Sequence, residues 1–161
     1  IKERTLRKSV FAFTENSAAE GEMLEVRYVR NDDMDNWFKL DGHLREEEFY
    51  NKVRDKTGYV LLCEGGFAGI LRYNLFWDSI PFCNLIYLDG RYRGMGYGRT
   101  LMEHWENDMK SKGFDLLLLS TRSDEDAQHF YRKLGYKDCG CIMIDIGKYA
   151  QPGELFFIKP I

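Results

Sequence analysis

Three glycines lie close together in the run Arg93-Gly94-Met95-Gly96-Tyr97-Gly98. The run follows an apolar, strand-like stretch at residues 85–88 and precedes a helical pattern that begins near Arg99. A helix leaves its first backbone N–H groups without intrahelical acceptors, and glycines let a phosphate approach such groups closely. The run therefore predicts a loop that binds the pyrophosphate of a nucleotide-bearing cofactor.

Two other phosphate-binding motifs do not fit this spacing. A Gly-x-Gly-x-x-Gly motif would need a third glycine at position 99 or 101, where the chain has Arg99 and Leu101. A Walker A loop ending at Thr100 would need glycine at 93 and lysine at 99, and both positions are arginine. The spacing does match Arg/Gln-x-x-Gly-x-Gly/Ala. In that form the run resembles the coenzyme A pyrophosphate loop of the GNAT superfamily of acetyl-CoA-dependent N-acetyltransferases.

A second segment strengthens this resemblance. Residues 124–136 follow the strand-like run 114–120 and resemble the GNAT pattern Asn-x-x-Ala-x-x-Phe/Leu-Tyr-x-x-x-Gly-Phe, with Asp124 in place of Asn and Tyr136 in place of Phe. The two motifs occur in the family's order and cover residues 85–136, and the flanking pattern extends the resemblance from about residue 23 to the end. It implies an α/β fold with three layers, α/β/α, and a central mixed, mostly antiparallel sheet splayed between its fourth and fifth strands.

The resemblance also implies a cofactor site. In the family the pantetheine arm of acetyl-CoA lies between the splayed strands, so here the backbones of Ile86 and Leu88 would pair with it. The Leu88 N–H would polarise the thioester carbonyl, a fixed-donor effect commonly worth about 3 kcal/mol. The two motifs place further residues at the cofactor: Arg93, Gly94, Met95, Gly96, Tyr97, Gly98, Arg99, Asp124, Ala127, Phe130 and Tyr131.

Tyr131 is the residue expected to handle a proton. A phenol with a pKa near 10 stays protonated at neutral pH, whereas a leaving thiol with a pKa near 8.5 departs as thiolate. The phenol can therefore hydrogen-bond the thiolate and return a proton, a transfer that is uphill by roughly 2 kcal/mol. Without the motif, a tyrosine beside Phe130 and Leu134 would be read as core. Asp124 either contacts the cofactor or caps the following helix.

The acceptor amine needs help, because deprotonating an alkylammonium with a pKa near 10.4 costs roughly 4.6 kcal/mol at pH 7. The sequence does not choose among the candidate bases, which are Glu64, Asp78, Asp89 and His129. An acidic group in the first third of the chain either attracts a cationic amine or forms a solvated helix face. Its members are Asp32, Asp33, Asp35, Asp41, Glu46, Glu47 and Glu48.

Length and composition fit a single globular domain. The chain has 161 residues, 44% of them hydrophobic, and a net charge of −3 that offers no basic stripe for nucleic acid. No apolar run approaches the roughly 20 residues of a membrane span, and no signal pattern opens the chain, so we expect a cytoplasmic protein. The four cysteines form no Cys-x-x-Cys pair, which predicts neither a metal site nor a disulfide framework. A homodimer remains open.

The remaining pattern predicts alternating elements after residue 22. Residues 1–22 lack a sustained period and are taken as an extension or a non-native appendage, so the catalytic domain would comprise residues 23–161. Helices are expected at 31–40, 44–55, from about 99 to 112, and at 124–134. In the third of these, Tyr97, Leu101, Trp105 and Met109 form a core stripe. Strands are expected at 23–29, 59–64, 67–77, 82–88, 114–120, 141–146 and 155–158, with Gly65-Gly66 as a hairpin turn.

These observations predict an acyltransferase that transfers acetyl from acetyl-CoA directly to a primary amine in a ternary complex. Cys83 is the only nearby nucleophile that could form an acyl-enzyme instead. One alternative is a coenzyme A sensor or regulatory module without turnover. Another is an enzyme that transfers a longer acyl group, or that acts on protein N-termini or lysines.

Overall fold

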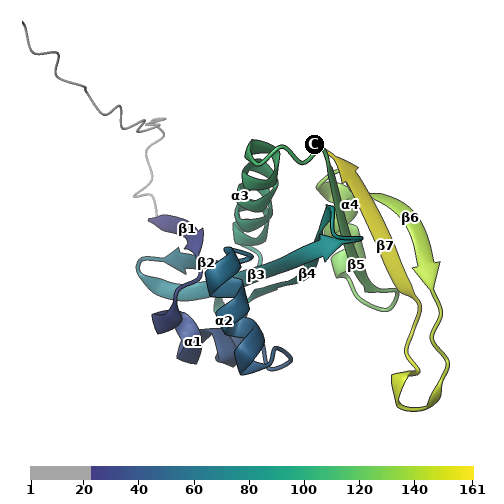
Figure 1. Cartoon of the computed structure of the whole chain (residues 1–161), viewed down its shortest axis with the longest axis horizontal. Helices are drawn as coiled ribbons and strands as arrows, with labels where there is room; N and C mark the ends of the chain where they lie inside the picture. Colours follow the sequence, from purple (N-terminus) through teal and green to yellow (C-terminus); the bar gives the residue numbers. More distant parts are fainter. Residues whose placement is uncertain (1–22) are drawn as a thin grey trace, which may run out of the picture.

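The computed structural model describes residues 23–161, so the proposed N-terminal appendage lies outside the described part of the chain. The described part folds into one sheet flanked by helices (Figure 1). The strands are β1 (Leu24–Tyr28), β2 (Gly58–Cys63), β3 (Gly66–Phe76), β4 (Ile80–Leu88), β5 (Leu116–Arg122), β6 (Lys137–Ile142) and β7 (Glu154–Pro160). The helices are α1 (Met34–Leu40), α2 (Glu46–Asp55), α3 (Tyr97–Ser111) and α4 (Ala127–Lys133).

The sheet is mixed, and it is splayed where the family resemblance predicts. Its strand order is β1-β2-β3-β4-β5-β7-β6, and every neighbouring pair is antiparallel except β4 and β5. The parallel pair is joined only at Phe82–Leu118 and Cys83–Leu119. Beyond these positions β4 continues to Leu88 and β5 continues to Arg122, but the two strands no longer pair with each other. The predicted fold class is confirmed, and the fork between β4 and β5 is its main opening.

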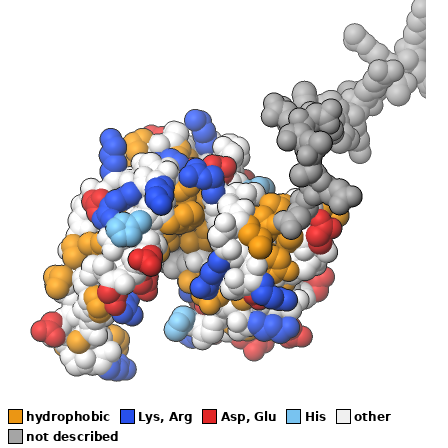
Figure 2. Space-filling view, turned by 180° about the vertical axis from the view of Figure 1, so that it is seen from behind, with side chains coloured by type: hydrophobic (Ala, Val, Ile, Leu, Met, Phe, Trp, Pro, Cys, Tyr) orange, Lys and Arg blue, Asp and Glu red, His pale blue; other side chains and the backbone are white. Residues whose placement is uncertain are grey.

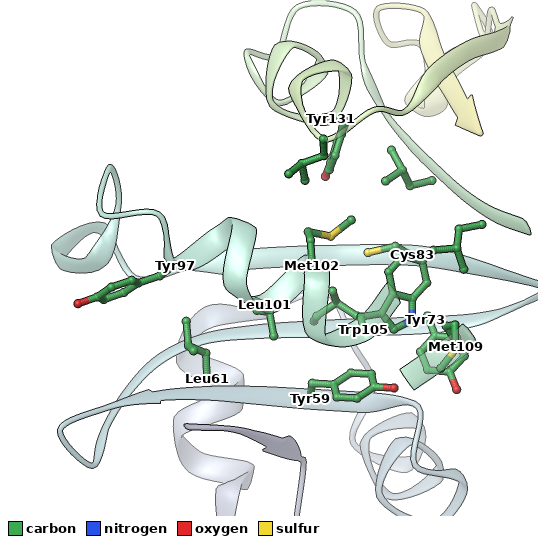
Figure 3. Packing of buried hydrophobic residues seen from close by; sticks show 14 of the residues in the cluster. Tyr59, Leu61, Tyr73, Cys83, Tyr97, Leu101, Met102, Trp105, Met109 and Tyr131 are labelled. Atoms are coloured by element: carbon green, nitrogen blue, oxygen red, sulfur yellow. The ribbon is translucent and has the colours of Figure 1, made fainter. Parts of the chain in front are cut away.

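Each face of the sheet has its own core. On one face, α3 and α4 cover a large cluster that includes Trp105 and Phe157, and Figure 3 shows its central part. On the other face, α1 and α2 cover a smaller cluster built on Trp37 and Phe49. The predicted stripe along α3 is confirmed as core, because Tyr97, Leu101, Trp105 and Met109 are all buried. These two layers of helices make the three-layer arrangement.

Several predicted boundaries were wrong by a few residues. The β2–β3 turn is Glu64-Gly65 rather than Gly65-Gly66, and both residues have positive φ, 49° and 76°. That geometry is a two-residue turn of the kind that matches strand twist, and here a glutamate accepts a conformation that favours glycine. The strand predicted at 141–146 is β6 at 137–142, because its pairing with β7 begins at Lys137. Helix α3 begins at Tyr97, and α4 begins at Ala127.

A bulge in β4 changes which residues face which core. Arg72 pairs with Leu85 and Tyr73 pairs with Cys83, which leaves Asn84 as an extra residue in β4. Cys83 belongs to the core under α3 and α4, whereas Leu85 packs against the core under α1 and α2. Ile86 and Leu88 then return to the α3–α4 side. The bulge lies next to the last β4–β5 pair, so it coincides with the fork.

Candidate active site

A cavity of about 710 Å³ lies on the α3–α4 side of the fork. It draws its walls from three elements that are far apart in sequence: the end of β4, the loop that leads into α3, and α4. The predicted site residues that line it are Ile86, Leu88, Arg93, Gly94, Gly96, Gly98, Arg99, Ala127, Phe130 and Tyr131. The fold thus brings the two sequence motifs to one cavity.

The β4 wall presents free backbone groups. The Asp89 N–H donates to the Ala68 carbonyl at 3.0 Å, so Leu88 and its partner Gly69 form a non-hydrogen-bonded pair of the antiparallel ladder. By the same alternation, Ile86 and its partner Leu71 are non-hydrogen-bonded. The N–H and C=O groups of Ile86 and Leu88 are therefore directed away from β3 and toward the fork. A ligand lying in the fork can pair with β4 as an added strand would.

The glycine loop supplies a second set of amides. Gly94 and Gly96 have φ of 78° and 85°, values that an L side chain rarely adopts, and Gly96 is the N-cap of α3. The Thr100 N–H bonds the Gly96 carbonyl at 3.2 Å, which begins the helical pattern. The N–H groups of Tyr97, Gly98 and Arg99 precede that bond and lack intrahelical acceptors. Together with the helix dipole they favour an anion at the mouth of the cavity.

Arg93 joins this loop to the strand. Its Nε donates to the Leu88 carbonyl at 3.0 Å. Its guanidinium carbon lies 4.8 Å from the ring centroid of Tyr87, which is within cation–π range. The Arg93 side chain therefore lies across the end of β4. It occupies the carbonyl of Leu88, so the N–H is the backbone group of Leu88 that stays unpaired.

Tyr131 projects from α4 into the cavity and is 6% exposed. In Figure 3 its hydroxyl points from α4 toward the sheet, on the side of Cys83. Burial raises the pKa of Tyr131 well above its usual value, and the nearby Cys83 and two carboxylates add to the rise. The phenol therefore stays protonated at neutral pH, and its O–H is able to donate a hydrogen bond. Among residues 23–161 its hydroxyl has no hydrogen-bond partner, so it is available to a ligand.

Three residues that the motifs placed at the cofactor do not line this cavity. Met95 is exposed on the loop. Tyr97 is buried in the core, with its hydroxyl 3.7 Å from the Cys63 sulfur. Asp124 precedes α4, whose N-cap is Asp126, and its carboxylate accepts hydrogen bonds from Arg122 at 2.6 and 3.0 Å. Those bonds lower the pKa of Asp124.

Three lining residues were not assigned to the cofactor site from the sequence: Tyr87, Asp126 and Lys133. Asp126 and Lys133 lie at unspecified positions inside the α4 motif, at the N-cap and the last residue of the helix, and their places could have been read from the helical period. Tyr87 carried no such signal, because its role depends on Arg93 folding back onto it.

The candidate bases are spread over the fold. Glu64 lies in the β2–β3 turn and accepts from the Met23 N–H at 2.5 Å. Asp78 lies in the β3–β4 turn, before the start of β4, whereas the cavity lies at the end of that strand. Asp89 pairs with Arg91, whose hydrogen bonds lower the pKa of that carboxylate. His129 is on α4 but does not line the cavity.

Two members of the acidic group hold the fold together. Asp33 accepts two hydrogen bonds from Arg27, at 2.7 and 2.8 Å, and one from the Arg30 N–H at 2.7 Å. Asp41 is 1% exposed and accepts from Arg72 at 2.6 Å. These two carboxylates are neutralised by half-buried arginines, so they add little to any long-range attraction of a cation.

No described helix is long and apolar enough to cross a membrane. Within residues 23–161 there is also no group of three histidine, cysteine, aspartate or glutamate side chains that could hold a metal ion.

Comparison with known proteins gives a family match. Residues 26–136 match the profile of the acetyltransferase (GNAT) family. A search of curated proteins finds no match.

Solved structures share the fold at low sequence identity. Ard1 from Thermoplasma volcanium is 16% identical, with a TM-score of 0.75, and the match covers 86% of this chain and 97% of that one. The ribosomal-protein-S18-alanine N-acetyltransferase from Escherichia coli is 18% identical, with a TM-score of 0.70 and coverage of 86% and 94%. A putative streptothricin acetyltransferase from Bacillus anthracis, in complex with acetyl coenzyme A, is 16% identical, with a TM-score of 0.75 and coverage of 87% and 98%.

Proposed function

Because this chain belongs to the GNAT family of acetyltransferases, we propose that it transfers acetyl from acetyl-CoA directly to a primary amine, with both substrates bound at once. One observation carries the proposal: the free amides of β4, the glycine loop and Tyr131 line a single cavity. An anion-binding loop, a strand edge and a neutral acid are the groups that a nucleotide thioester requires.

The residues that would hold acetyl-CoA have separate tasks. The N–H groups at the start of α3 suit the pyrophosphate, and the unpaired groups of Ile86 and Leu88 suit the amide-rich arm. The Leu88 N–H would stabilise negative charge on the thioester oxygen as the amine attacks, which such donors commonly favour by about 3 kcal/mol. Only a donor that is already fixed gives this benefit, and the β3–β4 ladder fixes this one.

Tyr131 would stabilise the departing sulfur. Its pKa lies above the usual value near 10, so complete proton transfer to a thiolate would cost more than the roughly 2 kcal/mol that ordinary values give. We therefore assign Tyr131 the role of hydrogen-bond donor to the thiolate. The proton that finally neutralises the sulfur comes from the amine nitrogen, which must lose two protons to form an amide.

The state of Cys83 favours direct transfer over an acyl-enzyme. Burial raises the pKa of the Cys83 thiol to about 12, so the nucleophilic thiolate is nearly absent at pH 7. A cysteine that accepted the acetyl group would need the opposite shift. The described part of the chain places no other cysteine in the large core except Cys63, which packs beside Tyr97.

The structural relatives act on different amines. One is named for an alanine of ribosomal protein S18 and another for streptothricin. We therefore propose a primary amine as the acceptor and include both peptides and small molecules in the test.

The test is an amine panel scored by release of free thiol from acetyl-CoA. The panel contains polyamines, aminoglycosides, amino acids, lysine-containing peptides and peptides with free N-termini. Thiol release with at least one amine, together with an acetylated product by mass spectrometry, would support the proposal. Tight binding of acetyl-CoA without turnover across the panel would instead favour a coenzyme A sensor.

A further inference from the structure

Two consecutive hydroxyls of β5 each donate to a carboxylate, on opposite faces of the sheet. Thr121 donates to Glu125 at 2.6 Å on the α3–α4 side. Ser120 donates to Glu154 at 2.5 Å on the other side. Neither Ser120 nor Glu154 belongs to a motif, and the family pattern described above does not include them.

Ser120 occupies the fork. Leu119 is the last β5 residue that pairs with β4, and Ser120 is the next residue along the strand. Because side chains alternate, Leu117, Leu119 and Thr121 face the α3–α4 core, whereas Ser120 faces away from it. Glu154 is the diagonal cross-strand neighbour of Ser120, since Ser120 pairs with Phe156 and Arg122 pairs with Glu154.

This face of the fork is open. Helices α1 and α2 pack over β2, β3 and the second half of β4, where Val60, Ile70 and Leu85 form their core. Figure 1 shows no helix below β5 and β7, and Figure 2 shows a notch between the part that carries α1 and α2 and the part that carries the β6–β7 hairpin. The cavity takes up the α3–α4 side, so an amine that attacks through the fork must come from the notch.

The neighbourhood of the pair is partly apolar. Phe82 lies between Phe76 and Phe156, with ring centroids 5.8 and 6.0 Å away, and all three are half-buried on this face. An ammonium that approaches across these rings loses solvent, which favours its neutral form, while a nearby carboxylate can accept its proton.

We propose that Glu154, with Ser120 as relay, accepts the proton that the acceptor ammonium must lose before it attacks. This inference rests on the proposed function. Ser120 Oγ takes a proton from the ammonium nitrogen as its own proton passes to Glu154 Oε1. The freed nitrogen lone pair forms the C–N bond, the C–S bond breaks, and the second nitrogen proton neutralises the sulfur that Tyr131 has stabilised. Glu154 then releases its proton to solvent.

The other charged and polar groups around Glu154 do not occupy the carboxylate oxygen that would accept the proton from Ser120. Gln151 Nε2 donates to Glu154 Oε2 at 3.3 Å, so Oε1 is the oxygen that faces Ser120. Arg122, directly across on β5, is held by Asp124. Through the sheet, the field of Glu154 reaches the phenol of Tyr131, which is also within reach of Glu125. Asn84 and Ile142, on β4 and β6, bring no charge.

The test uses Glu154→Gln, which keeps the shape of the side chain and an acceptor for Ser120. Two acceptors are compared: the best alkylamine of the panel, and its aminooxy analogue, whose nitrogen is already neutral at pH 7. We expect kcat/KM for the alkylamine to fall about 100-fold at pH 7, the size of a typical general-base contribution. The loss in kcat/KM should shrink as the pH approaches the pKa of the free alkylamine. For the aminooxy analogue, kcat/KM should fall less than threefold.

The matched control is Glu125→Gln, because it removes the carboxylate that accepts from the adjacent β5 hydroxyl on the opposite face. Glu125→Gln should leave the ratio of kcat/KM for the alkylamine to kcat/KM for the aminooxy analogue unchanged. Ser120→Ala provides a second variant and should show the same acceptor dependence as Glu154→Gln. Equal losses with both acceptors at every pH would assign the pair a purely structural role and overturn the inference. A wild-type protein that acetylates no amine would overturn the proposed function itself.

Discussion

The Nε of Arg93 donates a hydrogen bond to the carbonyl oxygen of Leu88 at 3.0 Å, which fastens the first residue of the glycine loop to the last residue of β4. The loop and the strand would bind different parts of acetyl-CoA. Their relative position is therefore set before the cofactor arrives, and a preorganised site loses less entropy on binding.

Arg93→Ala should weaken acetyl-CoA binding about 30-fold. The variant loses one hydrogen bond and the contact with Tyr87, each worth about 1 kcal/mol, although the backbone of the loop is unchanged. Isothermal titration calorimetry measures the change. Arg91→Ala is the control, because Arg91 pairs with Asp89 and does not line the main cavity. Equal effects of the two variants would mean that the loop responds only to general charge.

Gly96→Val should reduce acetyl-CoA affinity at least tenfold while the protein remains folded. A side chain at φ 85° is strained, so the loop must shift and the amides at the start of α3 lose their alignment with an anion. Calorimetry gives the affinity, and circular dichroism confirms the fold. Gly90→Val is the matched control: an added Cβ there meets nothing within 4 Å and the φ is not positive. Unchanged affinity in Gly96→Val would remove the loop from the cofactor site.

Tyr131→Phe should lower kcat by roughly 10²–10⁴ and leave the Kd for acetyl-CoA within about twofold. The ring still packs, and only the donor to the thiolate is lost. Tyr97→Phe serves as control, because Tyr97 is equally buried and its hydroxyl faces Cys63 in the core. If Tyr131→Phe retained at least half of the wild-type kcat, Tyr131 would be a core residue only.

Asp33→Asn should destabilise the fold by about 3 kcal/mol at pH 7, the usual result of removing one partner of a buried ion pair. Burial alone would raise the pKa of Asp33, but the hydrogen bonds from Arg27 and the Arg30 N–H outweigh it and hold the pKa below its usual value. A lowered folded-state pKa contributes stability above the unfolded-state pKa of about 3.9, and this contribution is lost as the pH falls further. The difference between the two proteins in urea unfolding should therefore be constant from pH 5 to 8 and shrink below about pH 4. A pH-independent difference would show that the charge of Asp33 is not responsible.

The glycine loop and the α4 motif were predictable because each is local. Gly94 and Gly96 adopt positive φ, which their lack of a side chain permits, and Tyr131 lies on the helix that its motif defines. The mixed character of the sheet and its splay followed from the family resemblance rather than from the strand patterns, and the strand order was not predicted. Within β4 the apolar residues Cys83, Leu85 and Ile86 do not alternate, and nothing in their types reveals that Asn84 is the extra residue.

Features that depend on distant partners were not predictable. Asp33 and Asp41 lie in an acid-rich segment whose composition predicts an exposed surface. In the structure both carboxylates are buried, and they form ion pairs with Arg27 and Arg72. Likewise, Ser120 and Glu154 are 34 residues apart, and only the β5–β7 register brings them into contact. The sequence pattern indicates which face of the sheet a residue occupies. It does not give the register between two strands, and the register decides which residues meet across the sheet.

The bulge residue Asn84 determines which faces of the sheet the residues at the end of β4 occupy. If Asn84 were paired as an ordinary strand residue, strict alternation would place Leu85 on the same face as Cys83, and residues 85–88 would all exchange faces. The bulge prevents this exchange, because it keeps Leu85 toward α1 and α2 while Ile86 and Leu88 stay toward α3 and α4. One extra residue thus decides which side of the sheet would serve the thioester and which side would be left for the nucleophile.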